Sequence, residues 1–163
     1  MKTKELTRLA MLTAAALVLH IVEAWLPTPF PIPGIRLGLA NIVTVYAVYR
    51  FSAGKTALML LARILLGSLF GGSILTLSFS LAGGFCCLAA MLLLRRVIPL
   101  RHVWMASLLG AICHNTGQLA VAAALVGKGV LAYAPFLLFA GCAAGIFTGL
   151  CAGMVLARMP VQE

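Results

Sequence analysis

The sequence contains no aspartate, and acidic residues of any kind are scarce. Glu5, Glu23 and Glu163 are its three carboxylates, against twelve Lys and Arg residues. Magnesium is held in proteins through oxygen ligands, for which clustered carboxylates are a common source. This shortage excludes an enzyme that handles diphosphates through magnesium sites of its own, and it predicts no metal site in the chain.

Charged residues of both signs are also few, and this scarcity indicates that the protein lies in a membrane and not in water. Only 9% of the 163 residues are charged, 63% are hydrophobic and the mean hydropathy is +1.13, far from the composition of soluble domains. A membrane-spanning helix needs about 20 mainly apolar residues, so the chain has room for about six. We predict an all-α integral membrane protein, a single domain over residues 1–163.

Pro, Gly and charged residues divide the apolar sequence into six runs. The first connection, LPTPFPIPG, is predicted to be stiff and extended, because Pro lacks an N–H donor and fixes its backbone. A turn rich in Gly and Ser, within LLGSLFGGSILTLSFSLAGGF, separates the third run from the fourth and is expected near the outer surface. The predicted helices cover roughly residues 8–26, 36–50, 56–76, 78–95, 103–126 and 131–157.

Basic residues predict the orientation of these helices, because Lys and Arg gather on the cytoplasmic side of membrane proteins. With both termini in the cytoplasm, Arg36 and Lys128 lie outside and Arg63 lies within a span. We therefore predict a multi-pass protein of the cytoplasmic membrane, in contact with the lipid bilayer. Its net charge of +9 then needs no nucleic-acid partner. The basic residues on the inner side are Lys2, Lys4, Arg8, Arg50, Lys55, Arg95, Arg96, Arg101 and Arg158.

Motifs for cofactor and covalent chemistry are incomplete. The segment AGKT ends like a phosphate-binding P-loop, but Tyr49 stands where the first Gly is required. Ser, His and a carboxylate occur without the arrangement of a nucleophilic triad. We expect no cofactor, and no catalysis by the chain on its own. The cysteines lie in apolar runs without the spacing of a zinc site or a disulfide framework, at Cys86, Cys87, Cys113, Cys142 and Cys151.

Four polar residues fall deep inside the predicted helices. His114, Asn115 and Gln118 share one face of the fifth, since positions i, i+1 and i+4 lie on one side of a helix. About a dozen residues, at ~1.5 Å each, separate His114 from the inner end and place it near mid-membrane. Arg63 lies somewhat nearer the cytoplasm in the third helix. Such residues either lock helices together or line a ligand cavity, and both interpretations stay open.

A second polar group lies near the predicted outer surface. His20 and Glu23 are spaced i, i+3 on one face of the first helix, and Arg36 and Asn41 enter on the second. Glu23 and Arg36 are expected either to form a structural ion pair or to stand at the mouth of a binding site under the Pro-rich connection. The arginines hint at an anionic ligand, because guanidinium grips carboxylate or phosphate with two hydrogen bonds.

The last predicted helix carries a glycine ridge. Glycines that recur every four residues align on one face and let a neighbouring backbone approach closely. The expected neighbour is either another helix of the same bundle or a second subunit. The glycines of the ridge are Gly141, Gly145, Gly149 and Gly153.

The chain contains ordered motifs that resemble the family of heptaprenyl diphosphate synthase component I, also called the Gx transporter family. The motifs are PGIRLGLANIVTVYAVY, ARILLGSLFGGSI, SFSLAGG and GAICHNTGQLAVAA, and the resemblance spans nearly the whole chain. The plan of six short helices, a structured first loop and an Ala-rich first helix is similar to the substrate-binding S components of energy-coupling factor transporters. The positions that the resemblance marks as functional are Arg36, Asn41, Arg63, His114, Asn115 and Gln118.

The two resemblances imply two different roles. The likeness to S components implies a small-molecule-binding or translocating subunit with a ligand site near the outer face and with separate ATPase and coupling subunits. It also implies a partner-docking surface on the first helix that includes Ala10 and Ala14. The family name implies a non-catalytic membrane accessory subunit of a heptaprenyl or polyprenyl diphosphate synthase, whose partner is a soluble synthase subunit. The substrate and the choice between these roles stay open.

Overall fold

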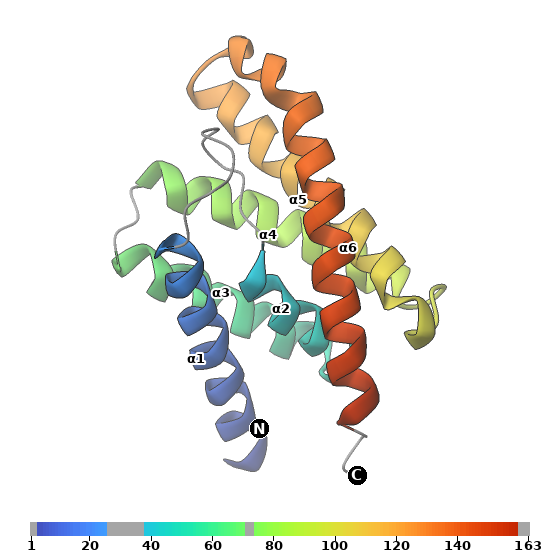
Figure 1. Cartoon of the computed structure of the whole chain (residues 1–163). Helices are drawn as coiled ribbons and strands as arrows, with labels where there is room; N and C mark the ends of the chain where they lie inside the picture. The colour runs from blue at the N-terminus through green and yellow to red at the C-terminus, as the bar shows by residue number, and fades with distance from the viewer. Residues whose placement is uncertain (1–2, 26–37, 71–73, 160–163) are drawn as a thin grey trace.

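The computed structural model describes residues 3–25, 38–70 and 74–159, which form helices and no strand. The prediction of an all-helical protein is therefore confirmed for the described residues. Short 3₁₀ helices, η1 (Leu100–His102) and η2 (Lys128–Tyr133), precede the last two α-helices. The α-helices are α1 (Thr3–Trp25), α2 (Leu39–Arg50), α3 (Ala53–Leu69), α4 (Ile74–Leu94), α5 (Val103–Leu125) and α6 (Ala134–Arg158) (Figure 1).

The helices pack in two groups of three. In the first group α1 lies against α2 and α3, and in the second α5 lies between α4 and α6. Contacts of α2 with α6 and of α3 with α4 join the two groups. The start of α1 and the end of α6 lie at the same end of the bundle (Figure 1).

The short helix α2 lies at the centre of the core. Ala47 and Val48 are completely buried, and each belongs to a different apolar cluster. Ala47 packs with Leu9 of α1 and Met59 of α3, whereas Val48 packs in a cluster to which α3, α4, α5 and α6 all contribute. A helix of 12 residues thus connects both groups through apolar contacts, which supply most of the packing energy in a core.

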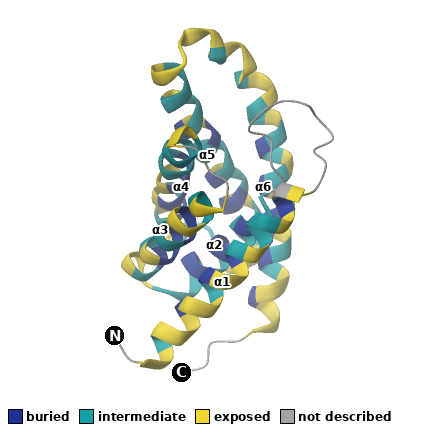
Figure 2. Ribbon diagram, turned by 90° about the vertical axis from the view of Figure 1, so that its left-hand side faces the viewer, coloured by how far each residue is buried: buried dark blue, intermediate teal, exposed yellow. Residues whose placement is uncertain are grey.

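Four helical segments are long and apolar enough to cross a membrane, namely Thr3–Glu23, Ile74–Leu94, Leu100–Leu125 and Lys128–Arg158. Only 11% of the most apolar window in Lys128–Arg158 is buried inside the protein, and Phe139 of α6 is 80% exposed. Figure 2 shows exposed residues along much of the outer surface of α6. Exposed apolar area on this scale is typical of a surface that meets lipid, so the structure is that of a membrane protein.

The ends of several helices differ from the predicted ones. The helix α1 starts at Thr3 instead of residue 8, because its polar first turns continue the helix beyond the apolar run. The helix α3 covers Ala53–Leu69 instead of residues 56–76, and α4 starts at Ile74 instead of residue 78. Hydropathy alone does not locate the break between α3 and α4. Helix propensity is the more useful signal there, because each Gly in a helix costs about 1 kcal/mol. The helix α6 starts at Ala134 instead of residue 131, with Pro135 in its first turn.

Two arginines cap the C-terminal ends of α2 and α6. Arg50 donates from Nη2 to the carbonyl of Leu156 at 2.9 Å and also to that of Met159, at the end of α6. Arg95 donates from Nη1 to the carbonyl of Val48 at 2.6 Å, at the end of α2. Cations stabilise the C-terminal ends of helices, whose last carbonyls lack partners. The positive charges of Arg50 and Arg95 therefore have a structural role.

Candidate functional site

The end of α1 and the start of α2 meet at a buried carboxylate. Glu23 is 6% exposed, and its Oε1 accepts a 2.5 Å hydrogen bond from the backbone N–H of Gly38. Gly38 has φ +75°, a left-handed conformation that favours glycine, and its carbonyl accepts a 2.8 Å hydrogen bond from the N–H of Asn41. Glu23 thus holds the first turn of α2 in place. Its expected partner Arg36 lies outside the described residues.

Arg63 of α3 reaches the same junction. Its side chain is buried, and Nη1 donates a 3.3 Å hydrogen bond to Oδ1 of Asn41. His20 of α1 packs against α3 one turn further along, where a Cβ on Gly67 would stand 3.3 Å from its Cδ2. Three helices therefore bring together the arginine cluster, which we define as His20, Glu23, Asn41 and Arg63.

The arginine cluster contains one carboxylate and one guanidinium in a largely apolar bundle. Insertion of a charged side chain at the centre of a membrane helix costs about 2.5–3.5 kcal/mol, so such groups need partners. No other acidic residue lies near Glu23 in the sequence. The hydrogen bond that Glu23 accepts from a backbone N–H is charge-assisted. Nη1 of Arg63 donates to Asn41, and a planar guanidinium carries several N–H donors in a fixed geometry. Such a group can bind a carboxylate or a phosphate.

His114 and Gln118 face α4, on the side of α5 that meets Gly83. A Cβ on Gly83 would stand 2.7 Å from Cγ of Gln118 and 3.0 Å from Nε2 of His114, so only glycine leaves space for these two side chains. The Nδ1 atom of His114 is buried and has no hydrogen-bond partner among the described residues.

Asn115 faces α6 instead. Its side chain is 9% exposed, and Nδ2 donates a 2.6 Å hydrogen bond to the carbonyl of Leu137. The amide fits beside Gly141, where a Cβ would stand only 2.0 Å from Nδ2. A buried amide held in this way fastens two helices to each other. The structure therefore places Asn115 at a contact between α5 and α6.

The glycine ridge of α6 lies against α5 over most of its length. A Cβ on Gly145 would stand 2.9 Å from the Cα of Leu108, and one on Gly149 would stand 2.5 Å from the Cα of Trp104. These glycines, like Gly141, allow the close approach of a helix in the same chain. Gly153 differs, because no atom lies within 4 Å of the position that its Cβ would take.

Some polar residues near the arginine cluster were not predicted from the sequence. Ser107 of α5 and Thr148 of α6 are buried and their hydroxyl oxygens lie 3.0 Å apart. A Cβ on Gly38 would stand 3.5 Å from Cγ2 of Thr148, so this pair lies beside the start of α2. Isolated Ser and Thr residues are common in helices of membrane proteins, and neither spacing nor charge distinguishes these two.

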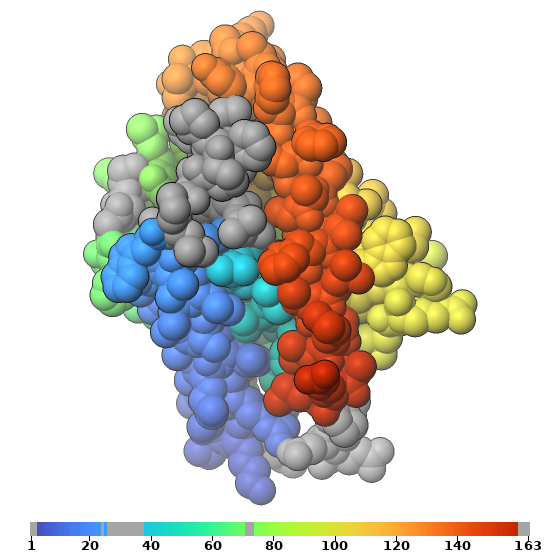
Figure 3. All heavy atoms as spheres, in the orientation of Figure 1, coloured from blue at the N-terminus to red at the C-terminus, as the bar shows by residue number. Residues whose placement is uncertain are grey.

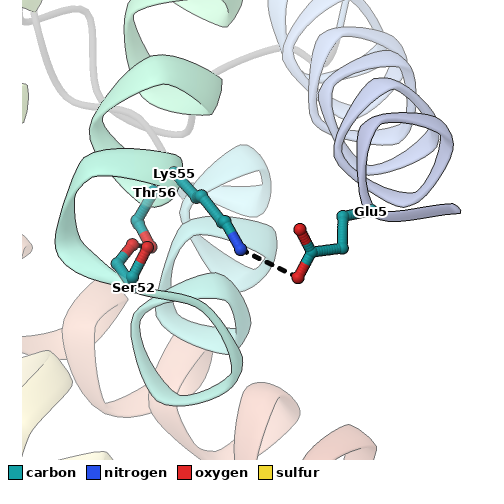
Figure 4. A network of polar contacts seen from close by, with 4 residues as sticks. All are labelled: Glu5, Ser52, Lys55 and Thr56. Atoms are coloured by element: carbon teal, nitrogen blue, oxygen red, sulfur yellow. Dashed lines mark hydrogen bonds and ion pairs between the residues drawn. The ribbon is translucent and has the colours of Figure 1, made fainter. Parts of the chain in front are cut away.

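A further ion pair lies away from the arginine cluster. Lys55 of α3 and Glu5 of α1 are 2.8 Å apart and about a third exposed, with 30% and 40% of their side chains accessible. Figure 4 shows this pair beside Thr56, whose Oγ1 donates to the carbonyls of Ser52 and Ala47. Exposed ion pairs contribute little to stability, so this contact positions the start of α1 against α3.

Fold and side chains together define a class, an all-helical membrane protein with buried polar residues. In residues 3–25, 38–70 and 74–159, no group of three or more His, Cys or acidic side chains is placed to hold a metal ion. A family model for heptaprenyl diphosphate synthase component I matches residues 12–155, and the chain belongs to this family. No curated protein and no solved structure matches the chain. The expected likeness to transporter S components therefore stays a prediction.

Proposed function

We propose that this chain is a non-catalytic, multi-pass subunit of the cytoplasmic membrane that binds or translocates an anionic small molecule at the arginine cluster. The observation that carries the proposal is Arg63, a guanidinium that is 8% exposed in an apolar helix. Charged residues at such positions are costly, and they mark substrate paths in membrane proteins. Guanidinium also matches the geometry of carboxylate and phosphate.

The residues around Arg63 supply further ligand contacts in this proposal. Asn41 already receives a hydrogen bond from Arg63, and His114 has a buried Nδ1 without a partner among the described residues. A buried polar atom without a partner costs free energy, which a ligand offsets by forming the missing hydrogen bond. His20 and Glu23 of α1 and Gln118 of α5 complete the proposed site among the described residues, and Arg36 is included on its sequence motif alone.

The first helix offers a surface for a partner protein. Ala10 and Ala14 of α1 are exposed, and they lie in register with Leu6 and Val18, which are 54% and 58% exposed. A face that combines small and apolar residues allows close helix packing in a membrane. In the S-component interpretation, the partners on this face are a coupling membrane subunit and its ATPase.

The family assignment favours a second candidate function, a membrane accessory subunit of a polyprenyl diphosphate synthase. The matching family is named for component I of such an enzyme, and the absence of Asp argues against magnesium-dependent catalysis by this chain. The synthase activity would then belong to a separate soluble subunit. The membrane subunit would hold the lengthening apolar chain near the bilayer.

Co-purification from native membranes separates the two candidates. The tagged chain is extracted in mild detergent, and both bound proteins and bound small molecules are identified by mass spectrometry. An ATPase together with a coupling protein supports the transport role, whereas a soluble prenyl synthase supports the accessory role. Recovery of neither partner after crosslinking in intact membranes would count against both roles.

The ligand site is tested by thermal unfolding of the purified protein against a panel of carboxylates and phosphates. We expect at least one compound to raise the melting temperature of the parent, and Arg63→Gln to abolish that increase. Asn115→Ala is the matched control, because it removes a buried polar side chain at the α5–α6 contact and should lower the melting temperature but keep the increase. An increase that survives Arg63→Gln would refute the proposed site.

A further inference from the structure

A groove opens where α5 begins and α6 ends. The two helices cross and then diverge toward the start of α5 and the end of α6 (Figure 1). The space between them has a volume of about 440 Å³, and apolar side chains line most of it, including Leu100, Trp104, Leu150 and Met154. Pockets for small molecules and cofactors have volumes of about 300–1,000 Å³, so the groove is large enough for a ligand.

Gly153 forms part of the groove wall without packing against its own chain. At Gly149, one turn earlier, the backbone of Trp104 fills the space that a side chain would need. A Cβ on Gly149 would stand 2.5 Å from the Cα atom of Trp104. At Gly153 no atom lies within 4 Å of the corresponding position. Figure 3 shows the first turns of α5, in yellow, beside the last turns of α6, in red. The helix backbone of α6 is therefore accessible from the groove at this glycine.

The charge around the groove favours an anion. Arg101 lines the groove and is exposed, and it makes no hydrogen bond or ion pair with the residues that the structure describes. Arg158 is exposed as well and lies four residues after Met154, on the same side of α6. The described acidic residues, Glu5 and Glu23, are both on α1. No carboxylate therefore lines the groove to neutralise Arg101.

We propose that this groove binds a polyprenyl diphosphate, with the prenyl chain against the apolar walls and the diphosphate at Arg101. An apolar groove with one cationic end matches a ligand that has a long apolar chain and an anionic head. The choice of a prenyl chain over a phospholipid rests on the proposed accessory role, which the name of the family supports. The groove is distinct from the arginine cluster, because none of that cluster's residues lines it.

Trp104 provides a direct readout of occupancy, since it lines the groove and the chain has only two Trp residues. In the Trp25→Phe background, all tryptophan fluorescence comes from Trp104. The full chain in phosphatidylcholine nanodiscs is titrated with farnesyl diphosphate. We expect a saturable blue shift of the emission, because the ligand displaces water from around the indole.

Two variants and one control test the position of the ligand. Gly153→Leu should fill the groove and weaken farnesyl diphosphate at least tenfold, because its side chain has free space to occupy. Arg101→Gln should weaken farnesyl diphosphate about tenfold through the lost guanidinium–phosphate contact but leave farnesol unchanged. Gly54→Leu is the control, because a Cβ at Gly54 also has no neighbour within 4 Å and lies in α3. It should bind like the parent.

The comparison compounds decide between possible sources of the anion. Inorganic diphosphate should bind much more weakly than farnesyl diphosphate, because it lacks the chain. Farnesyl diphosphate that binds Gly153→Leu as tightly as the parent would overturn the inference. Phosphatidylglycerol that produces the same shift and displaces farnesyl diphosphate at equal concentration would overturn it too, since the groove would then be a phospholipid site. Binding in the groove without a synthase in the co-purification would retain the inference and reject only the accessory role.

Discussion

Gly141→Ala is a small change with an effect that the geometry predicts in sign. The new Cβ would stand 2.0 Å from Nδ2 of Asn115, so the amide must move and lose its hydrogen bond to the carbonyl of Leu137. Overpacking costs about 1–3 kcal/mol, and interhelical hydrogen bonds in membranes contribute about 0.6 to 1.7 kcal/mol. Ala regains about 1 kcal/mol of helix propensity over Gly. We expect a net loss of about 1–4 kcal/mol.

Two companion variants isolate the cause of this loss. Gly153→Ala meets no atom within 4 Å, so only helix propensity acts and the protein should gain about 0.5–1 kcal/mol. In an Asn115→Ala background the clashing amide is gone, and the nearest remaining neighbour at Gly141 is the carbonyl oxygen of Ala111 at 3.8 Å. There Gly141→Ala should become neutral or stabilising.

The assay is reversible unfolding in mixed micelles, followed by tryptophan fluorescence as the denaturing detergent fraction rises. The parent, Gly141→Ala, Asn115→Ala and the variant with both substitutions form a double-mutant cycle, and the four proteins are compared at one protein concentration. A coupling energy of at least about 1 kcal/mol is expected, because residues in direct contact deviate from additivity. If Gly141→Ala costs the same in both backgrounds, or costs nothing in either, the close contact between Asn115 and Gly141 is wrong.

Gly38→Ala should lower stability by about 1–2 kcal/mol in the same assay, because φ +75° is a left-handed conformation that disfavours a Cβ; Gly129→Ala, where a Cβ meets nothing within 4 Å, should be neutral. Arg50→Ala should cost about 1–3 kcal/mol, since it removes charge-assisted hydrogen bonds to the last carbonyls of α6. Lys55→Ala should cost less than about 1 kcal/mol, because its ion pair with Glu5 is partly exposed. That small loss should vanish in 1 M salt, whereas the effect of Arg50→Ala should persist.

The helical class and the order of the six helices follow from the sequence, because hydropathy and helix-breaking residues act locally. The break between α3 and α4 was placed several residues too late, since the apolar residues on both sides continue past it. The central position of α2 was not predicted. Its 12 residues are the shortest apolar run, yet Ala47 and Val48 are fully buried. Burial at the centre depends on which helices surround a segment, and hydropathy contains no such information.

The candidate site residues were chosen from the sequence, but the helices and side chains that each of them contacts were not predicted. His114 and Asn115 were assigned to one face of a helix, but adjacent positions are separated by about 100° around the axis. That angle is enough for His114 to meet Gly83 of α4 and for Asn115 to meet Gly141 of α6. The partner of each side chain depends on helix packing that a single sequence does not specify. Glu23 illustrates the same point, because its partner is a backbone N–H, which no side-chain pattern reveals.

Gly153 poses a question that packing within the chain does not answer. A glycine in a helix interior costs about 1 kcal/mol relative to alanine, and Gly145 and Gly149 offset that cost by admitting the backbone of α5. Helices that cross at an angle diverge on either side of the crossing, so a ridge longer than the contact has an uncovered end. Gly153 lies at that end, within the groove that Arg101 borders. An occupant of the groove, such as the proposed prenyl chain, would give this last glycine of the ridge a contact that the chain itself does not supply.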